Sequence, residues 1–304
     1  MTAPHPASPA ARAEIVLGVL GGSGLYAMST LQNVRAVELS TPFGAPSGPY
    51  TVGELPRPGL PPLRAAFLPR HGAGHVLLPG EINYRANIHG FKQLGVTHLL
   101  SVSAVGSLRE EIVPGHVVLP DQLIDRTRGR HSTYFGGGVV AHIQFGDPID
   151  ERLRARVLAA AEAEGATVHD RGALVVMEGP AFSTRAESER YRGMGARIIG
   201  MTALPEAKLA REAEISYAIL ALATDYDCWR VGEEEVSVQA VMAVLQRNVA
   251  LAQAVVLRLA AGLPYGEADL PYPRALAHAI NTAPASITAE ARQRLDLIIG
   301  HYLA

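Results

Sequence analysis

The chain has 304 residues, of which 48% are hydrophobic, and this is enough apolar material for a sizeable buried core. Its 27 basic and 29 acidic side chains give a formal net charge of −2, so charge offers no reason to expect nucleic acid or an anionic membrane as a partner. The single cysteine, Cys228, excludes an internal disulfide and favours a reducing, cytoplasmic location.

The N-terminal segment, residues 1–13, is rich in proline and alanine. It lacks the basic start and apolar block of a secretory signal, so we expect a flexible tail followed by one domain over residues 14–304. The most apolar helical segment, Val238–Ala260, is interrupted by Gln246, Arg247 and Asn248, which do not suit a membrane span. We therefore predict no membrane partner.

Short apolar runs alternate with segments of helical period along the chain, which is typical of an α/β fold, a sheet covered by helices. The predicted strands are Glu14–Leu20, Leu63–Leu68, His98–Val102, His116–Leu119, Ala173–Met177, Arg197–Ile199 and Ser216–Ala223. The predicted helices are Ile82–Leu94, Glu151–Glu164, Ala186–Gly193, Pro205–Glu212, Val238–Ala260 and Thr288–Tyr302. Residues 262–286 are dense in proline and glycine, so we expect a surface connector before a C-terminal helix over residues 288–302.

A glycine-rich turn follows the first predicted strand. Gly22–Ala27 satisfies the G-x-G-x-x-G/A pattern of dinucleotide-binding folds, and Glu38 ends a following apolar run. The segment after Gly24 is too short for the long helix of that fold, so an NAD-dependent dehydrogenase is a weak interpretation and a plain tight turn is a second one. The third interpretation is that backbone N–H groups and the Ser23 hydroxyl bind an oxyanion such as phosphate.

Two other strand ends carry groups that suit an anion. Arg70 and His71 follow one strand with a guanidinium fork and an imidazole, and small hydroxyl residues with glycine occupy residues 101–107. Because ligands of open α/β sheets bind at the carboxyl ends of strands, we expect these ends to converge. His71 and His75 are four apart, but two glycines separate them and no zinc signature accompanies them, so we predict no metal site.

Asp225 and Asp227 come just after the strand predicted at Ser216–Ala223. If the backbone stays extended there, both carboxyl groups point to one face and Tyr226 to the other. Mutual repulsion and burial raise the pKa of one carboxyl, which makes a proton donor available near neutral pH. Taken alone, the same residues also fit a solvated or helix-capping acidic turn.

A series of segments between residues 15 and 262 reads, in order, GGSGLY, TPFGAPS, RHG, NYRANI, GSLREEIVPG, QLIDRT, EGPAFSTRAES, GMTALPEAKLARE and ATDYDCW. Their order and spacing resemble the methylthioadenosine branch of the purine nucleoside phosphorylase family. EGPAFSTRAE is shared with the wider family, whereas ATDYDCW resembles its adenine-specific branch. The resemblance implies a single-domain α/β fold with a mixed central sheet flanked by helices. It also implies a homo-oligomer, a trimer or a dimer of trimers, with active sites near subunit contacts.

The resemblance further implies which residues form the site. The phosphate contacts would be Ser23, Arg70, His71, Ser103, Ala104 and Thr202. The nucleoside contacts would be Met201 along the ribose, Phe182 beside the purine, Thr224, Asp225 and Asp227 at the purine edge, and Val238, Val241 and Met242 around the 5′-methylthio group. His142 would approach from a neighbouring subunit, while a plain core role is the alternative for the three residues at the start of the long helix. Asp225 and Asp227 would be catalytic, and no cofactor is expected because inorganic phosphate is a co-substrate.

The implied reaction is a pentosyl transfer of purine and methionine salvage, the reversible phosphorolysis of S-methyl-5′-thioadenosine to adenine and 5-methylthioribose 1-phosphate. Asp225 would protonate or hydrogen-bond N7 of the leaving purine, while phosphate neutralises the cationic ribosyl centre. Asp227 would accept from the 6-amino group. The alternatives are a 6-oxopurine or methylthioinosine phosphorylase, a hydrolytic nucleosidase, the dehydrogenase above, and a non-catalytic nucleotide-binding protein.

The sequence departs from the family pattern at a few positions. Gly200 stands where some members carry asparagine, so any contact from that side chain is missing. Ser23 and Ser103 replace threonines of other members and retain the hydroxyl group. The resemblance is thin beyond Gly262.

Overall fold

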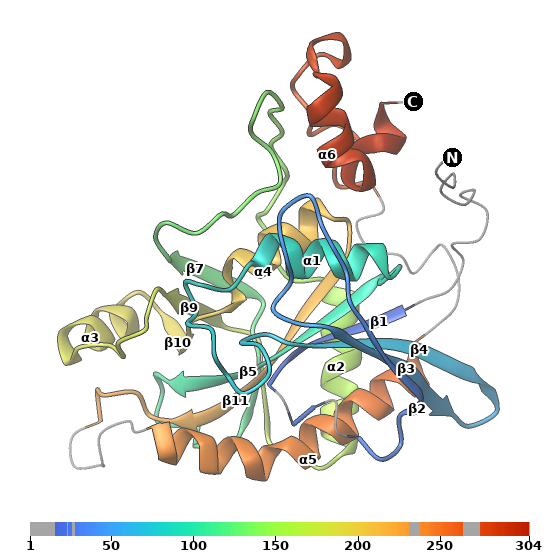
Figure 1. The fold of residues 1–304 in the computed structure, drawn as a ribbon. Coiled ribbons are helices and arrows are strands. Elements are labelled where there is room, and N and C mark those ends of the chain that lie inside the picture. The colour runs from blue at the N-terminus through green and yellow to red at the C-terminus, as the bar shows by residue number, and fades with distance from the viewer. Residues whose placement is uncertain (1–15, 23, 26–27, 231–237, 264–273, 304) are drawn as a thin grey trace.

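The computed structural model describes residues 16–22, 24–25, 28–230, 238–263 and 274–303, and of residues 238–247 it describes the backbone only. The predicted tail, residues 1–13, and part of the predicted connector therefore lie outside the described residues. A sheet of 11 strands forms the centre of the molecule, with helices above and below it (Figure 1).

The strands are β1 Val16–Gly21, β2 Gln32–Val37, β3 Tyr50–Arg57, β4 Leu60–Pro69, β5 His98–Ser107, β6 Val117–Leu119, β7 Gln122–Arg126, β8 Val168–Asp170, β9 Ala173–Met177, β10 Ala196–Gly200 and β11 Ser216–Asp225. The helices are α1 Tyr84–Gln93, α2 Glu151–Ala163, α3 Arg185–Gly193, α4 Ala203–Glu212, α5 Val238–Gly262 and α6 Ala289–Ile299, with 3-10 turns at Pro284–Ser286 and Gly300–Tyr302. Among the described residues, no helix is long and apolar enough to cross a membrane.

The sheet contains both parallel and antiparallel pairs. Its main path runs β2-β3-β4-β1-β5-β10-β9-β7, while β11 pairs with β5 and β6, and β6 pairs with β8. β1 is parallel to β4 and β5, and β5 is parallel to β11 but antiparallel to β10. This confirms the mixed sheet flanked by helices. It also argues against a dinucleotide-binding fold, because β2 pairs antiparallel with β3 and forms no second parallel strand.

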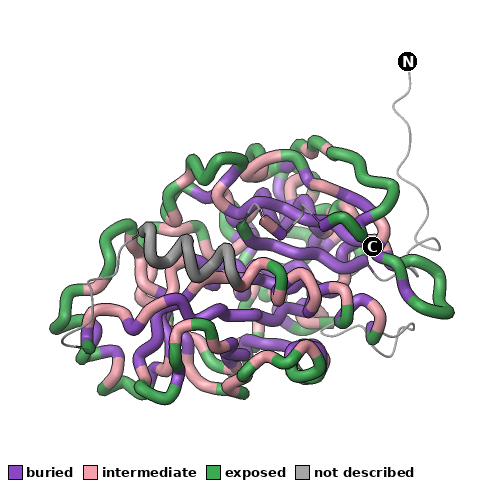
Figure 2. Tube along the Cα trace, turned by 90° about the horizontal axis from the view of Figure 1, so that it is seen from below, coloured by how far each residue is buried: buried purple, intermediate pink, exposed green. Residues whose placement is uncertain are grey.

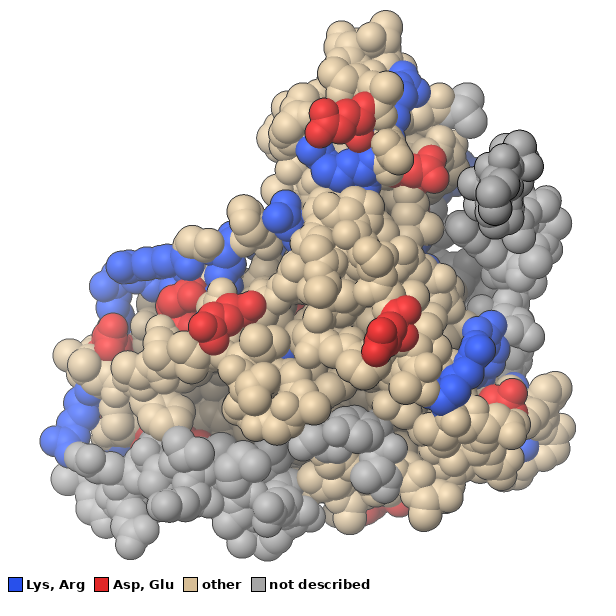
Figure 3. Space-filling view, in the orientation of Figure 1, with Lys and Arg blue, Asp and Glu red and all other residues tan. Residues whose placement is uncertain are grey.

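The central strands are buried on both faces. Every residue of β1 is buried, as are all residues of β11 except the last, and such strands read as continuous apolar runs. Helices α1 and α4 pack together above the sheet, while α2 and α5 pack against each other and against β11 (Figure 1). Figure 2 shows the buried strands in purple at the centre of the molecule, with exposed segments in green around them. On the face shown in Figure 3, acidic and basic side chains are interspersed on a largely uncharged surface, as the small net charge suggests.

Polar caps define where the helices begin. The side chains of Asn83, Asp150, Thr184 and Thr288 each accept a hydrogen bond from a backbone N–H in the first turn of α1, α2, α3 and α6. Each such cap contributes on the order of 1 kcal/mol. Helix α2 ends before Gly165, whose φ of +76° suits glycine and stops the helix.

The structure contains all the predicted helices and strands, with small shifts at their ends. One boundary was wrong, because β5 does not stop at Val102 but continues to Ser107 along its partner β11. The sequence also missed β2, β3, β7 and β8. In β2 the first five residues are exposed, so no buried face marks the strand in the sequence.

Candidate active site

The carboxyl ends of β1 and β4 lie side by side, next to the middle of β5. Gly21 pairs with Pro69, and Leu20 pairs with Ser101, in neighbouring parallel strands. The Arg70 backbone N–H donates to the Gly21 carbonyl at 2.9 Å. Two of the three predicted strand ends therefore meet, whereas β5 continues past them to Ser107. Ser23 lies outside the described residues, so its predicted phosphate contact stays a prediction.

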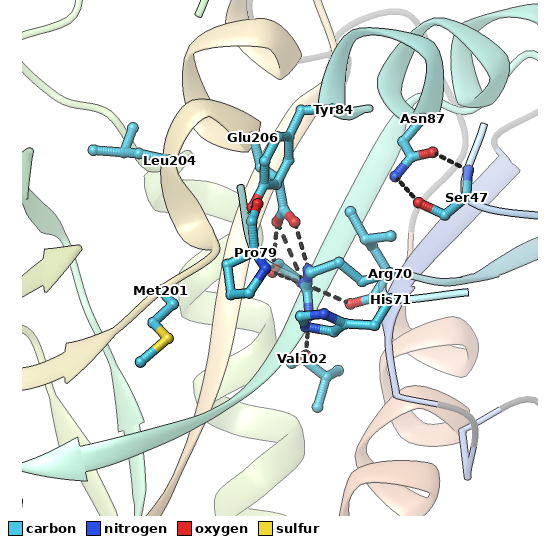
Figure 4. Close-up of polar contacts among 12 residues, drawn as sticks. Ser47, Arg70, His71, Pro79, Tyr84, Asn87, Val102, Met201, Leu204 and Glu206 are labelled. Atoms are coloured by element: carbon cyan, nitrogen blue, oxygen red, sulfur yellow. Dashed lines mark hydrogen bonds and ion pairs between the residues drawn. The ribbon is translucent and has the colours of Figure 1, made fainter. Parts of the chain in front are cut away.

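Arg70 is almost fully buried and points into the protein (Figure 4). Its Nε and Nη2 donate to the two carboxylate oxygens of Glu206 at 2.5 and 3.3 Å, and Nη2 also donates to Ser101 Oγ at 2.6 Å. Nη1 and Nη2 donate to the carbonyls of Val102 and Leu20, each at 3.1 Å. A guanidinium has five N–H donors, so at most one N–H of Nη1 remains for a ligand. The fork that the sequence suggested for an anion holds a buried counter-charge instead.

Glu206, on α4, is fully buried and joins this arginine to two hydroxyl groups. Its Oε2 accepts from Ser101 Oγ at 3.0 Å and from Tyr217 Oη at 2.9 Å. Burial alone would lower the pKa of Arg70, but the Glu206 carboxylate outweighs burial and raises it. The guanidinium is therefore charged and held in one orientation.

His71 is held as a neutral imidazole. Its Nδ1 lies 2.8 Å from the Leu77 carbonyl oxygen, and since a carbonyl can only accept, Nδ1 carries the hydrogen. Burial, together with the charges of Arg70 and His75, lowers the pKa of His71 to about 4, although the hydrogen bond to Leu77 opposes this shift. The Nε2 atom is therefore a hydrogen-bond acceptor at neutral pH.

The His71 and His75 rings stack with their centroids 4.2 Å apart. No group of three histidine, cysteine, aspartate or glutamate side chains that could hold a metal ion occurs within the described ranges.

Two hydroxyl groups near these strand ends are not used by the fold. Ser103 Oγ, on β5, is buried and has no hydrogen-bond partner among the described residues. Thr202 is the residue before α4, yet its side chain forms no capping hydrogen bond. Ala104 lies beside Ser103 and pairs with Leu222 of β11. The backbone of Leu204 is not helical, so a kink separates Thr202 from the main part of α4.

The backbone at the acidic pair differs from the predicted extended strand. β11 ends at Asp225, and Asp227 has a φ of +52°, in the left-handed region that aspartate tolerates. Asp225 Oδ1 accepts from the Asp227 N–H at 2.8 Å, and Oδ2 accepts from Thr224 Oγ1 at 2.7 Å. A Cβ on Gly106 would lie 3.0 Å from Asp225 Oδ1 and 3.4 Å from Asp227 Cβ. A turn, and not an extended strand, therefore brings both acids against Gly106 of β5.

Burial raises the pKa of both carboxyl groups. For Asp225 this outweighs the hydrogen bonds from Thr224 and from the Asp227 N–H, which lower the pKa. For Asp227, burial and the neighbouring Asp225 charge outweigh the interactions with Ser188, Cys228 and Ser183, which lower the pKa. Asp227 Oδ2 is buried and has no hydrogen-bond partner among the described residues. The pair therefore offers a carboxyl that is more readily protonated and one unpaired acceptor oxygen.

The remaining predicted contacts are spread around these groups. Met201 precedes Thr202, and its sulfur would lie 2.6 Å from a Cβ on Gly179, so the two residues are closely packed. Phe182 has 44% of its surface exposed. Val238, Val241 and Met242 begin α5, but their side chains lie outside the described part of the chain, so their contacts stay predictions.

His142 is exposed and lies outside the helices and strands. Its backbone N–H donates to the Ala279 carbonyl at 2.8 Å.

Two residues with buried, charged side chains were not identified from the sequence, Glu206 and Arg130. Arg130 Nη1 donates to the Met201 and Leu204 carbonyls at 2.6 and 2.8 Å, and its Nε lies 3.0 Å from a Glu178 carboxylate oxygen. It thereby fixes the backbone on either side of Thr202. For Glu206 a signal exists in the sequence, because this carboxylate interrupts an otherwise apolar stretch, residues 203–207.

Comparisons with known proteins agree on one family. The model of the phosphorylase superfamily matches residues 16–261. The S-methyl-5′-thioadenosine phosphorylase of Geobacter sulfurreducens is 57% identical to this chain, over 95% of this chain and 100% of its own length. The enzyme of the same name from Synechocystis sp. is 54% identical, over 94% of this chain and 87% of its own length.

Solved structures agree with these relatives. The crystal structure of a methylthioadenosine phosphorylase from an antarctic soil metagenomic library has a TM-score of 0.86 at 44% identity, covering 94% of this chain and 99% of that one. Methylthioadenosine phosphorylase from Schistosoma mansoni in complex with adenine has a TM-score of 0.75 at 37% identity, covering 82% of this chain and 91% of that one.

Proposed function

This chain belongs to the phosphorylase superfamily, and we propose that it catalyses the reversible phosphorolysis of S-methyl-5′-thioadenosine to adenine and 5-methylthio-α-D-ribose 1-phosphate. The shared name of its relatives supports this reaction. The observation that carries the proposal is the half-buried pair of Asp225 and Asp227 beside β5, the same strand that carries the unpaired Ser103 hydroxyl. A carboxyl group that can protonate the purine and a hydroxyl group that can bind phosphate thus lie along one strand.

The acidic pair handles the purine. When the N-glycosidic bond breaks, the purine leaves poorly unless its N7 is protonated or strongly hydrogen-bonded. Because burial raises the pKa of Asp225, this carboxyl is more readily protonated near neutral pH and acts as the general acid on N7. Asp227 accepts a hydrogen bond from the 6-amino group through its unpaired Oδ2. A 6-oxopurine presents a second acceptor at that place, and the buried carboxylate would then stay unpaired.

Phosphate binds beside the ends of β1 and β4, next to the middle of β5. The hydroxyl groups of Ser103 and Thr202 donate to it. The buried charge of Arg70 attracts it as well. Because His71 donates through Nδ1 to the backbone, its Nε2 accepts a hydrogen bond from a protonated phosphate oxygen.

The bond changes then need no covalent enzyme intermediate. The bond between C1′ and the purine nitrogen breaks, its electron pair goes to the purine, and Asp225 supplies the proton at N7. The electron-poor C1′ is stabilised by the phosphate charge, and a phosphate oxygen forms the new bond to C1′. Positioning and charge of the two substrates therefore account for catalysis.

We also propose that the enzyme is a homotrimer or a dimer of trimers in which His142 reaches a neighbouring site. The exposure of His142 supports this arrangement. Light scattering measures the subunit number. A His142→Ala variant with an unchanged KM for the nucleoside and an unchanged oligomer would contradict the assignment.

We place one catalytic domain at residues 14–304, because side chains from β1 to α6 belong to one continuous core. We further propose a cytoplasmic location, in keeping with the single cysteine, Cys228. Phosphate is treated as a substrate and no cofactor is assigned.

Product analysis tests the proposed reaction. Methylthioadenosine, adenosine and methylthioinosine are each incubated with the enzyme, with and without phosphate, and the base and sugar products are identified. We expect adenine and the sugar 1-phosphate from methylthioadenosine only when phosphate is present. Phosphate-independent turnover would identify a nucleosidase, and equal or faster turnover of methylthioinosine would identify an oxopurine phosphorylase.

A further inference from the structure

A second group of cationic side chains lies between α1 and α6, apart from the strand-end site. Arg85 of α1 and Arg294 of α6 line a pocket of about 350 Å³ together with Phe43, Tyr134, Phe135 and Gly136. We call this the two-arginine pocket. Its volume falls within the range of small-molecule sites, roughly 300–1,000 Å³.

Neither arginine has a counter-charge within the described residues. The Arg85 side chain makes no hydrogen bond or ion pair there, and its guanidinium carbon lies 5.2 Å from the centre of the Phe43 ring. Arg294 donates through Nη2 to the Gly136 carbonyl at 2.6 Å, and its Nε, like that of Arg85, is buried without an acceptor. Burial lowers the pKa of Arg85 and the facing charge of Arg294 lowers it further, although Tyr134 opposes both.

Two arginines with more deeply buried side chains are arranged differently. Arg70 is paired with Glu206, and Arg130 is paired with Glu178. A carboxylate stabilises such an arginine, since a buried charge without a partner is costly. The two-arginine pocket instead brings two half-buried like charges to one place and leaves the Nε donor of each unpaired.

We propose that the two-arginine pocket binds the phosphoryl group of a small molecule, either free phosphate or a phosphate monoester. Two guanidinium forks match the geometry and charge of a phosphoryl group, and the bound dianion removes the repulsion between them. Phe43, Tyr134 and Phe135 provide apolar walls that contact the organic part of a monoester. The site is separate from the proposed catalytic phosphate site, so it does not depend on that assignment.

Binding stoichiometry of the full-length assembled protein tests the proposal. Isothermal titration calorimetry with inorganic phosphate is expected to show two sites per chain, and ribose 5-phosphate is titrated in a second arm. Tighter binding of ribose 5-phosphate assigns the pocket to a monoester, and tighter binding of phosphate assigns it to the free ion. A single phosphate site per chain in the unmodified protein, with no site for ribose 5-phosphate, overturns the proposal without recourse to any variant.

Variants locate the second site. We expect Arg85→Gln and Arg294→Gln each to weaken it about tenfold or more, while the first phosphate site and kcat stay unchanged. Arg190→Gln is the matched control, because Arg190 is exposed on α3 and the same charge is removed far from the pocket. Unchanged affinity in both pocket variants refutes the site. A changed subunit number with unchanged phosphate binding refutes it as well, and assigns the arginines to contact with a second copy of the chain.

Discussion

The pairing of Arg70 with Glu206 predicts that Glu206→Gln, which replaces one carboxylate oxygen with an amide nitrogen, greatly lowers the free energy of unfolding. Glu206→Gln keeps the size of the side chain but removes the counter-charge of a fully buried guanidinium. The amide oxygen retains one acceptor for Arg70, whereas the carboxylate accepts from Arg70, Ser101 and Tyr217. Breaking a buried pair in this way costs about 3–5 kcal/mol, and the remaining acceptor places the expected loss near 3 kcal/mol. That loss lowers Tm by roughly 6–12 °C.

Thermal and urea unfolding at pH 7 measure this loss, and phosphate kinetics show whether Arg70 has also moved. We expect the apparent KM for phosphate to rise more than the KM for the nucleoside, because the guanidinium is no longer held in place. Glu189→Gln is the matched control, because Glu189 forms an exposed ion pair with Arg192 at 3.6 Å. Exposed pairs contribute little, so we expect this variant to change the free energy of unfolding by less than about 0.5 kcal/mol. A Glu206→Gln protein within about 1 kcal/mol of the unmodified chain would refute the idea that Arg70 depends on this carboxylate.

Three further variants test the rest of the site. Ser103→Ala should raise the KM for phosphate about tenfold with little loss of stability, because the Ser103 hydroxyl has no hydrogen-bond partner in the described fold. Ser216→Ala is the control, because it removes an equally unpaired hydroxyl elsewhere and should leave the kinetics unchanged. Asp225→Asn should lower kcat for methylthioadenosine about 100-fold and shift preference toward methylthioinosine, so equal kinetics on both nucleosides would remove Asp225 from the mechanism. Burial raises the pKa of Glu212 from 4.5 to about 7, so the folded state binds this proton more tightly than the unfolded state does. The contribution of Glu212 to the free energy of unfolding therefore falls as pH rises from about 4.5 to 7. Urea unfolding at pH 5 and pH 8 should therefore show a stability difference of about 2–3 kcal/mol that Glu212→Gln abolishes, and an equal pH dependence in the variant would count against this.

The strands and helices that were predicted correctly are those whose pattern is local. β1 and β11 are covered on both faces, so their sequences are continuous apolar runs, and α2 is bounded by a capping Asp150 and a terminating Gly165. β2 was not predicted because its residues 32–36 are exposed. Among the described strands it pairs only with β3, residues 50–57. A strand held by pairing at the edge of a sheet leaves little periodic signal.

For the site, local order along the chain determined which groups meet. Because β1 and β4 are parallel neighbours, the residues that follow them come together, and they do so beside the middle of β5. The acidic pair was recognised, but not its geometry. A left-handed Asp227 and a hydrogen bond from its own N–H to Asp225 bring the two acids together in a turn that alternation along a strand does not describe.

By itself the sequence determined the α/β class and the family. Only the tertiary structure decided how the charges are paired. Glu206 lies 136 positions from Arg70, and their contact turns the expected anion-binding fork into a buried, hydrogen-bonded pair. It likewise brings Arg85 and Arg294 together from two distant helices. Periodicity and capping act over a few residues, whereas the energy of a buried charge depends on which partner the whole fold places beside it.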